Sequence, residues 1–388
     1  MRRVYLDHTA TTPLDPEVFE VMKPYFSEKY GNASSIHSFG QEARAALDGS
    51  RDRIAKILGA RSSEIVFVSS GTEADNFALK GAAFAMRASS QKNHMITSKG
   101  EHHAVLDTCE YLEQQGFDVT YLELDQYGMV EPERVRKAIT PKTGLISIMH
   151  ANNEVGTINP IKEIGRIAKE HGIIIHSDVV QTFGKMPVNV DDLGVDLCSM
   201  SAHKIYGPKG IGALYIRKGV TIDRFMHGGG QERGWRAGTE NVPLAVGFAE
   251  AAARISERQQ TEWERLKKLK EIFRKKIESS FPFVLFNAHL SNSLPHILNI
   301  SFDSSKVDID GEALLFNLDL KGIAVTSGSA CTSGSMEPSH VLLAMGRDEK
   351  TAHATIRFSM GKSTTEEEIE YTVGALREVV SNVAKARA

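Results

Sequence analysis

A single cysteine near the end of the chain, Cys331, lies in a run of very small residues that extends over positions 326–335. Serine, threonine, alanine and glycine cannot build a hydrophobic core, and the glycines leave the backbone conformationally free. A thiol in such a segment is accessible to a reaction partner, whereas a buried structural thiol is inert. The alternative is a Ser/Gly linker that contains a cysteine by chance. Whether Cys331 is a reactive thiol or part of a linker depends on whether other residues of the chain offer chemistry that such a thiol could use.

An aspartate and a lysine each follow an apolar run that has the composition of a buried strand. Asp178 follows the run 172–176, and Lys204 follows the run 195–199 at the start of a Gly/Pro-rich turn. A carboxylate at the end of a buried strand needs a cationic partner, and the protonated ring nitrogen of pyridoxal phosphate (PLP) is one. A desolvated lysine at the same place is a candidate for a Schiff base with that cofactor. Alone, each residue is more simply a turn cap or a surface lysine, but the pair is far more specific than either member.

Two further segments offer groups that suit a phosphate. Residues 69–73 follow a predicted strand and open a helix, where backbone N–H groups and the hydroxyl of Thr72 bind anions well. Ser201 and His203 precede Lys204 and add hydrogen-bond donors beside it. A plain helix N-cap would have the same sequence at Thr72. The segment therefore indicates a phosphate site only in combination with Asp178 and Lys204.

A histidine and an arginine extend the same constellation. His102 follows the predicted strand 94–98, so its imidazole is expected at the same sheet edge, where it could stack on an aromatic cofactor and move protons. The adjacent His103 also suggests a metal site, but no third ligand stands at a suitable spacing. Arg357 lies inside a short apolar strand and needs a fixed anionic partner, which is either a substrate carboxylate or a structural salt bridge.

Short β-branched runs alternate with longer amphipathic stretches through the first two-thirds of the chain. This alternation predicts an α/β fold with a mostly parallel sheet that helices cover on both faces. Ligands bind at the carboxyl ends of such strands, which is where the polar residues described above stand. The predicted strands are 64–68, 94–98, 118–124, 145–150, 173–176, 195–199 and 213–216, and the predicted helices among them are 73–86, 104–115, 131–139 and 161–171.

The pattern changes in the last third of the chain. Residues 242–280 are charged and helical, which predicts a helix that leaves the large domain for a smaller α+β domain. We predict a large domain over residues 15–260 and a small domain built from residues 1–14 and 261–388, with a mobile cysteine loop at about 324–338. The predicted elements of the small domain are strands at 293–301 and 354–359 and helices at 311–318 and from about 365 onward.

The composition is that of an ordinary globular protein of 388 residues with a formal net charge of -3. Basic residues are scattered along the chain, which argues against a nucleic-acid-binding surface. The three cysteines, Cys109, Cys198 and Cys331, form no C-x-x-C pair, so a reducing cytoplasm is expected. The N-terminus lacks the apolar core of a signal peptide, and no apolar run approaches the roughly 20 residues that span a bilayer. We expect a cytoplasmic protein without membrane or nucleic-acid partners.

Together these residues resemble the PLP-dependent enzymes of fold type I, the aspartate-aminotransferase fold, whose large domain has a mostly parallel seven-stranded sheet. The chain is most similar to the cysteine desulfurases of the NifS/IscS type, which are class-V aminotransferases. The resemblance covers nearly the whole chain, and the long Ser/Gly loop around Cys331 is typical of the NifS/IscS group. The motifs that carry it are 5–13 (YLDHTATTP), 30–37 (YGNASSIH), 151–156 (ANNEVG), 201–210 (SAHKIYGPKG), 236–241 (RAGTEN), 327–341 (SGSACTSGSMEPSHV) and 364–369 (TTEEEI).

The resemblance implies roles for the matched residues. Lys204 corresponds to the Schiff-base lysine, Asp178 to the partner of the pyridine nitrogen, and His102 to the residue that stacks on the ring and transfers protons. Gln181 would bond the phenolic oxygen of the cofactor. The remaining cofactor and substrate contacts would come from a phosphate cup of Gly71, Thr72, Ser201 and His203, from Thr239 of the opposite subunit of a homodimer, and from Asn153 and Arg357, which clamp the substrate carboxylate.

The same resemblance implies a reaction. L-Cysteine would lose its sulfur to Cys331 and leave as L-alanine, and the resulting persulfide would pass to an iron–sulfur scaffold protein of the IscU/NifU type. No resident metal is implied, although Cys331 is a candidate for a transient iron–sulfur ligand. The alternatives are a selenocysteine lyase or another PLP-dependent C–S lyase in which Cys331 is dispensable, and a non-catalytic partner that keeps only the fold.

Three segments depart from the pattern of the family. His8 and Thr9 stand where two asparagines are usual, and Ala33 replaces a proline. Val179 and Val180 follow Asp178, where the family places a small alanine first. Added methyl groups beside the cofactor ring would shift its tilt, and a misplacement of about 1 Å can cost on the order of a hundredfold in rate. The sequence therefore predicts modest turnover that improves in Val179→Ala.

Overall fold

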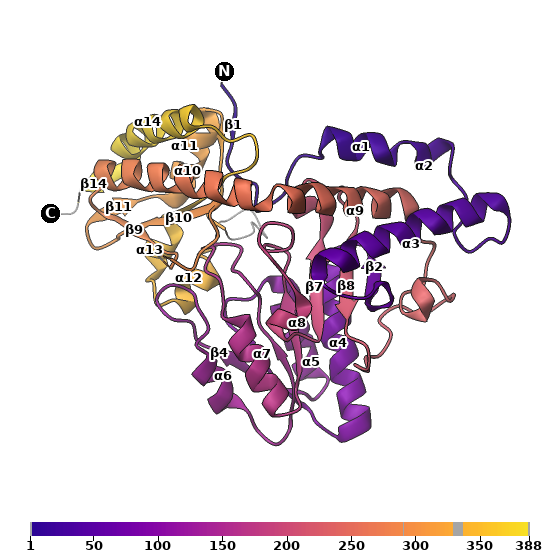
Figure 1. The fold of residues 1–388 in the computed structure, drawn as a ribbon. Helices are drawn as coiled ribbons and strands as arrows, with labels where there is room; N and C mark the ends of the chain where they lie inside the picture. The colour runs from indigo at the N-terminus through magenta and orange to yellow at the C-terminus, as the bar shows by residue number, and fades with distance from the viewer. Residues whose placement is uncertain (1, 290, 329–336, 387–388) are drawn as a thin grey trace.

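The computed structural model describes residues 2–289, 291–328 and 337–386 (Figure 1). Cys331 and most of the predicted cysteine loop lie outside the described residues. In the part of the chain that is described, a large domain with a central sheet and a smaller domain lie side by side (Figure 1). None of the helices in these described ranges is long and apolar enough to cross a membrane.

The large domain is built on one seven-stranded sheet. Its strand order is β2 (Ile65–Val68), β8 (Gly212–Ile216), β7 (Leu197–Ser201), β6 (Ile174–Asp178), β5 (Thr143–Ser147), β3 (His94–Ser98) and β4 (Asp118–Leu122). Only β8 runs antiparallel to its neighbours in this sheet, and the other pairings are parallel. The predicted α/β fold with a mostly parallel sheet is confirmed.

Helices cover both faces of this sheet, so its inner strands are buried on both sides. Every residue of β5 and β7 is buried, as expected for parallel strands between two helical layers. Two apolar clusters fill the space between strands and helices. The helices of the large domain are α1 (Pro16–Met22), α2 (Pro24–Ser27), α3 (Ser38–Leu58), α4 (Gly71–Ser90), α5 (His103–Gln114), α6 (Pro132–Ala138), α7 (Ile161–Glu170), α8 (Val190–Leu193) and α9 (Val242–Glu257).

The small domain has a core of its own that also includes Val4 and Leu6 from the N-terminus. Its three-stranded antiparallel sheet has β10 (Ile297–Phe302) between β9 (Val284–Phe286) and β13 (Thr355–Ser359). The N-terminal β1 (Val4–Tyr5) pairs with β12 (Ile323–Ala324). The other elements are β11 (Val307–Ile309), β14 (Ala384–Ala386), α10 (Gln259–Ser280), α11 (Gly311–Leu320), α12 (His340–Ala344), α13 (Glu349–His353) and α14 (Glu366–Val383). The exact domain bounds remain a prediction.

The predicted single helix over 242–280 is wrong in one respect, because two helices occupy this segment. α9 ends at Arg258, whose N–H caps the carbonyls of Ile255 and Ser256, and α10 begins directly after it. The two helices lie nearly end to end across both domains (Figure 1). The reason is their packing: the buried residues of α9 belong to the core of the large domain, whereas those of α10 belong to the small domain.

The central strands also continue further than the apolar pattern predicts. β6 ends at Asp178 and β7 at Ser201, so both residues are the last of a strand rather than the first of a turn. The polar residues in this region pair across the sheet: His176 Nδ1 bonds to Ser147 Oγ at 2.9 Å and His176 Nε2 bonds to Ser199 Oγ at 2.9 Å. Satisfied hydrogen bonds let a strand carry polar side chains in its interior.

Candidate active site

A cavity of about 480 Å³ opens at the carboxyl ends of β6 and β7 and is closed from the other side by residues of the small domain. It unites most of the residues that the sequence singles out, which come from segments far apart in the chain. Ten predicted site residues line it: Gly71, Thr72, His102, Asn153, Asp178, Gln181, Ser201, His203, Lys204 and Arg357.

Lys204 lies in the short 3₁₀ turn that follows β7, and its ammonium reaches across to the N-terminal segment. Its Nζ donates to the carbonyl oxygens of Thr9 at 2.6 Å and Ala10 at 2.7 Å. Burial and, to a smaller extent, the nearby Arg357 lower the pKa of Lys204 to about 8, although Asp178 and Asp7 oppose this shift. A lysine in this state is neutral in a substantial fraction of molecules near neutral pH, as an amine nucleophile must be.

Asp178 and two further carboxyl groups form an acidic cluster on the sheet side of the cavity. Burial raises the pKa of Asp178 to about 6, against the hydrogen bond from Val180 N and the charge of Lys204. Asp75, from α4, also lines the cavity, and burial together with the charge of Asp178 raises its pKa well above the usual value. Burial raises the pKa of Glu101 to about 8. Such a cluster favours a cation in the cavity, because ionised carboxyl groups without one are costly in a dry environment.

His102 is the N-cap of α5, and this position fixes its tautomer. Its Nδ1 accepts the backbone N–H of Ala104 at 3.0 Å. Burial first, and then the positive charge of Lys204, lower the pKa of His102 to about 4. The imidazole is therefore neutral near pH 7 and carries its proton on Nε2, the nitrogen that remains available to a ligand.

The N-terminus of α4 forms a narrow anion cradle against β6 and β7. A Cβ atom on Gly71 would lie 3.1 Å from Val180 Cγ2 and 3.5 Å from Ser201 Cβ, so only glycine leaves this space open. Thr72 follows it in the first turn of the helix, and His203 is held by a contact of 3.1 Å between its Nδ1 and Thr11 Oγ1. Backbone N–H groups and hydroxyls in this arrangement suit a phosphate.

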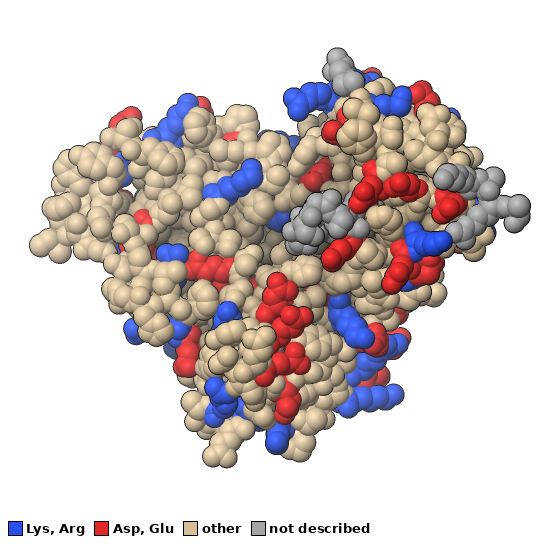
Figure 2. Space-filling view, turned by 180° about the vertical axis from the view of Figure 1, so that it is seen from behind, with Lys and Arg blue, Asp and Glu red and all other residues tan. Residues whose placement is uncertain are grey.

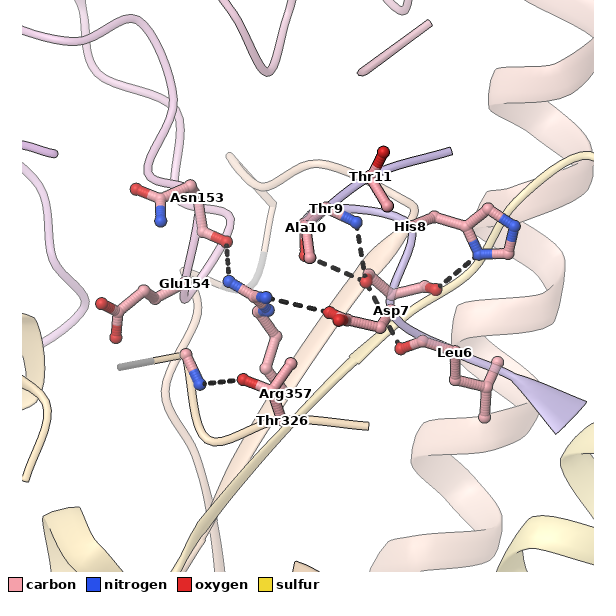
Figure 3. Close-up of polar contacts among 12 residues, drawn as sticks. Leu6, Asp7, His8, Thr9, Ala10, Thr11, Asn153, Glu154, Thr326 and Arg357 are labelled. Carbon is pink, nitrogen blue, oxygen red and sulfur yellow. Dashed lines mark hydrogen bonds and ion pairs between the residues drawn. The ribbon is translucent and has the colours of Figure 1, made fainter. Parts of the chain in front are cut away.

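Arg357 projects from β13 into the opposite side of the cavity (Figure 3). Its Nη1 donates to the carbonyl oxygen of Asn153 at 3.0 Å, and its Nη2 donates to Asp7 Oδ1 at 3.0 Å. Its Nε is buried and has no hydrogen-bond partner among the described residues. The guanidinium is thus fixed in place by two of its five N–H groups, and the Nε–H together with the second N–H of each other nitrogen is left to bind a small carboxylate.

Sequence reasoning missed two carboxylates of this site, Asp7 and Asp75. Asp7 stands inside the motif 5–13, but only the three-dimensional pairing with Arg357, 350 residues away, reveals its place. Asp75 lies four residues after Gly71 on α4, so helical spacing from the anion cradle was the available signal. Both carboxylates line the cavity that also contains the cationic side chains of Lys204 and Arg357.

Two predicted residues are not brought to the cavity. Thr239 is exposed in the glycine-rich segment 227–241 and does not line it, and its predicted contact requires a second subunit. Cys331 lies outside the described residues. The ends of its segment are anchored nearby: Gly328 lines the cavity, and Ser339 Oγ donates to Glu154 Oε2 at 2.5 Å.

The premise of the Val179→Ala prediction is wrong, because Val179 does not face the cavity. Its side chain is fully buried in the core of the large domain, and Val180 lines the cavity instead. The chain turns directly after β6, and the hydrogen bonds from the N–H groups of Thr182 and Phe183 to the carbonyl oxygen of Val179 belong to this turn. We therefore expect Val179→Ala to lower stability by about 1 to 3 kcal/mol through a core cavity, without a gain in turnover.

The remaining departures from the family pattern are accommodated. His8 is buried, and its Nδ1 bonds to the carbonyl oxygen of Ser359 at 3.0 Å. Thr9 donates through both its backbone N and its hydroxyl to Ser359 Oγ, at 3.0 and 2.9 Å. Ala33 lies in the core of the large domain. These contacts hold the N-terminal segment against β13, next to Arg357.

Comparison with known proteins decides the family. Residues 4–372 match the class-V aminotransferase family. The chain belongs to this family. A cysteine desulfurase IscS from Dictyoglomus turgidum is 51% identical over 382 residues, which cover 98% of this chain and 95% of the relative.

Solved structures of class-V aminotransferases have the same architecture. A NifS-like protein is similar with a TM-score of 0.91 and 41% identity, covering 98% of this chain and all of the other. The structure of SspA in complex with cysteine is similar with a TM-score of 0.80 and 41% identity, covering 92% and 98% of the two chains. The predicted membership of the NifS/IscS group of cysteine desulfurases, which are PLP-dependent enzymes, is confirmed.

The described residues of this class-V aminotransferase fit PLP. The anion cradle at Gly71 would take its phosphate, and the acidic cluster would take its protonated ring nitrogen. Asp75 Oδ1 is buried and has no hydrogen-bond partner among the described residues, which is the arrangement expected where a cation is to be received. Lys204 stands between the two ends of the cavity with the depressed pKa that a Schiff-base lysine requires.

Proposed function

We propose that the chain removes sulfur from L-cysteine, releases L-alanine and holds the sulfur as a persulfide on Cys331 before passing it on. The observation that carries this proposal is the convergence of Lys204, Asp178, His102 and Arg357 on one cavity. The relatives that match over nearly the whole chain carry the name cysteine desulfurase, which supports the choice of substrate.

Arg357 binds and orients the substrate through its carboxylate. Its Nε is free to donate, and its other two nitrogens are held by Asp7 and the Asn153 carbonyl. A carboxylate on the guanidinium forms charge-assisted hydrogen bonds, which are about twice as strong as neutral ones. The side chain of Asn153 lines the same wall and supplies an amide beside the carboxylate.

Lys204 and His102 hold and move protons. Bound PLP supplies an electron sink that stabilises negative charge on the substrate carbon. Lys204 Nζ, neutral in part near pH 7, accepts the proton from the substrate Cα and can return it. His102 offers its Nε2 proton to the substrate side of the cavity. Asp178 keeps the opposite side negative.

Cys331 receives the sulfur. Its thiolate attacks the substrate sulfur, an S–S bond forms and the bond from sulfur to the substrate Cβ breaks. The carbon skeleton keeps the electron pair of the broken bond, takes up a proton and leaves as L-alanine. The sulfur atom, now bonded to Cys331 Sγ, is the outermost atom of a persulfide that a second thiol can reduce or accept.

The acceptor and the assembly are further parts of the proposal. The persulfide passes to an iron–sulfur scaffold protein of the IscU/NifU type in the cytoplasm. Two copies of the chain form a homodimer in which Thr239 completes the phosphate cup of the neighbouring subunit. Exposed apolar side chains on the N-terminal helices α2 and α3 and on the segment between them support such a dimer, among them Phe26, Tyr30, Ile36 and Phe39. The side of the molecule that carries α1, α2 and α3 shows few charged side chains in Figure 2.

The test is the formation of L-alanine from L-cysteine by the purified protein with added PLP. We expect alanine with the wild-type chain and at least a hundredfold slower formation, roughly, in Lys204→Ala, because the amine that binds cofactor and moves protons is gone. Lys162→Ala, on the exposed face of α7, is the matched control and retains full activity. Absence of alanine with the wild type, or full activity of Lys204→Ala, contradicts the proposal.

The same assay separates the alternative of a selenocysteine lyase. A C–S or C–Se lyase that does not need the thiol keeps its alanine formation in Cys331→Ser, with L-cysteine or with L-selenocysteine as substrate. The proposed function predicts that Cys331→Ser loses alanine formation from L-cysteine.

A further inference from the structure

Lys185 is a lysine at the rear of the site that has no carboxylate partner. It lies in the turn region that follows β6. Its Nζ has two polar neighbours: Gln181 Oε1 at 3.2 Å and His296 Nε2 at 3.4 Å. Within the part of the chain that the structure describes, no ion pair with a carboxylate involves it. Lys185 is half-buried, and a lysine that is partly withdrawn from water without an acidic partner needs a reason.

The titratable groups closest to Lys185 are basic. The charge of Lys185 acts on His8, His203 and His296, and Lys204 in turn acts on Lys185. Burial, and then the charge of Lys204, lower the pKa of Lys185 to about 7. On the side away from the active site it borders a second cavity, of about 430 Å³, whose walls include Val18, Ile255 and Trp263. Asp15, Gln259 and Glu262 also line this second cavity, but among the described residues none of them forms a hydrogen bond or ion pair with Lys185.

Contacts with Lys185 and Thr9 fix the orientation of the Gln181 amide. The ammonium form of Lys185 only donates and the carbonyl oxygen of Thr9 only accepts, so the amide oxygen lies toward Lys185 and the amide nitrogen toward Thr9. Gln181 Nε2 then lies on the other side, where it donates to the carbonyl oxygen of Thr9 at 3.2 Å. An amide nitrogen has two hydrogens, and Gln181 lines the active-site cavity. The second N–H is therefore left for an acceptor in that cavity.

We propose that Lys185 is a positioning residue, which holds Gln181 with its amide N–H directed at the phenolic oxygen of bound PLP. The proposal rests on the proposed function, since it assigns a task to a residue next to the cofactor. Without Lys185 the amide keeps only its contact with Thr9, so it turns more easily and can present its oxygen to the cavity, where that oxygen would repel the negatively charged phenolic oxygen. His296 keeps Lys185 in place by accepting its second hydrogen bond.

The absorption spectrum of the bound cofactor tests this directly. The visible band of PLP on its lysine changes with pH, and a hydrogen bond to the phenolic oxygen lowers the pH midpoint of that change because it stabilises the negative oxygen. We expect the midpoint of Lys185→Met to rise by about 0.5 to 1 pH unit, the shift that one hydrogen bond produces. Lys185→Gln keeps an N–H donor and is expected to stay near the wild type. Lys162→Met, on the surface, should not change the midpoint.

A double-mutant cycle shows whether Lys185 acts through Gln181. In a Gln181→Leu background, Lys185→Met should produce no further shift, because the amide that it orients is absent. Lys185→Ala replaces Lys185→Met in the cycle should the latter not fold, as judged by circular dichroism. An unchanged midpoint in the folded single variant, or an equal shift in both backgrounds, overturns the proposal. A wild-type chain that binds no PLP at all would instead contradict the proposed function.

Discussion

At the scale of single residues, the site works by charges that are withdrawn from water. Lys204 is held by two backbone carbonyls rather than by a carboxylate, and burial lowers its pKa despite the opposing charges of Asp178 and Asp7. Asp178, Asp75 and Glu101 face it with pKa values above their usual range, because burial favours their neutral forms. A cavity with these two sets of groups takes up a molecule that is anionic at one end and cationic at the other. PLP has this distribution of charge.

The pH dependence of cofactor uptake follows from Lys204. Its pKa is lowered to about 8, so half of the amine is neutral near pH 8 and nearly all of it about one pH unit higher. We expect the rate at which cofactor-free protein takes up PLP to rise from pH 6 to about pH 9 and then to level off, as followed by the visible absorption of the bound cofactor. An ordinary lysine, with a pKa of about 10.4, would give a rate that keeps rising past pH 9, and this result would contradict the account.

At the scale of the elements, buried pairs attach the loops of the site to the sheet. Arg51 on α3 forms two hydrogen bonds with Glu232, at 2.6 and 2.9 Å, and Glu232 also accepts the backbone N–H of Phe67 in β2 at 2.9 Å. This contact ties the segment 227–241, which carries Thr239, to the large domain. At the other side of the cavity, Glu154 accepts a hydrogen bond from the hydroxyl of Ser339. This contact attaches the start of α12 to the large domain.

Breaking the Arg51–Glu232 pair is expected to be costly. Arg51→Met leaves the carboxylate of Glu232 buried without its cation, which typically costs about 3 to 5 kcal/mol. Arg53 lies on the same helix as Arg51 and forms a more exposed ion pair with Glu250 of α9, at 2.9 Å. It is the matched control, with an expected loss of about 0 to 1 kcal/mol in Arg53→Met. Urea denaturation monitored by circular dichroism measures the free energy of unfolding of both variants. Equal and small losses in the two variants would show that the buried pair does not anchor the segment.

Much of the fold and of the site could be predicted from the sequence, and the exceptions have physical causes. The strands and helices around Asp178, Lys204 and Thr72 follow from apolar runs and helix starts, which are local signals. The ends of β6 and β7 were missed because His176 and Ser199 satisfy each other across the sheet. The contacts of Asp7 with Arg357 and of Lys185 with His296 join residues more than a hundred positions apart. No local pattern records such pairs.

At the scale of the whole molecule, the active site is built where two domains and, in the proposed dimer, two subunits meet. β13 brings Arg357 from the small domain to the carboxyl ends of the strands of the large domain. The N-terminal segment 7–10 fills the space between them and contacts both Arg357 and Lys204. The exposed apolar surface around Ile36, which is 90% exposed in the isolated chain, marks the face expected to meet the second subunit.

The proposed dimer predicts a specific effect of a charge at this face. Ile36→Asp would place a carboxylate in the subunit contact, so we expect a shift from dimer to monomer and weaker PLP binding because Thr239 no longer reaches the neighbouring cup. Phe316, 64% exposed on α11 of the small domain, gives the matched control Phe316→Asp, which should remain a dimer. Light scattering after size-exclusion chromatography measures the mass. A monomeric wild type, or a dimeric Ile36→Asp with unchanged PLP affinity, would contradict the proposal.

The central claim is that Cys331 takes the sulfur of L-cysteine as a persulfide. Its most direct test is mass spectrometry of the intact protein and of its Cys331 peptide after a brief reaction with L-cysteine. We predict the gain of one sulfur atom on Cys331, reversed by a thiol reductant, with none on Cys109 or Cys198, which are buried. The Cys331→Ser chain should gain no sulfur and form no alanine. Undiminished alanine formation by Cys331→Ser, with no added sulfur on Cys331 in the wild type, would contradict the account.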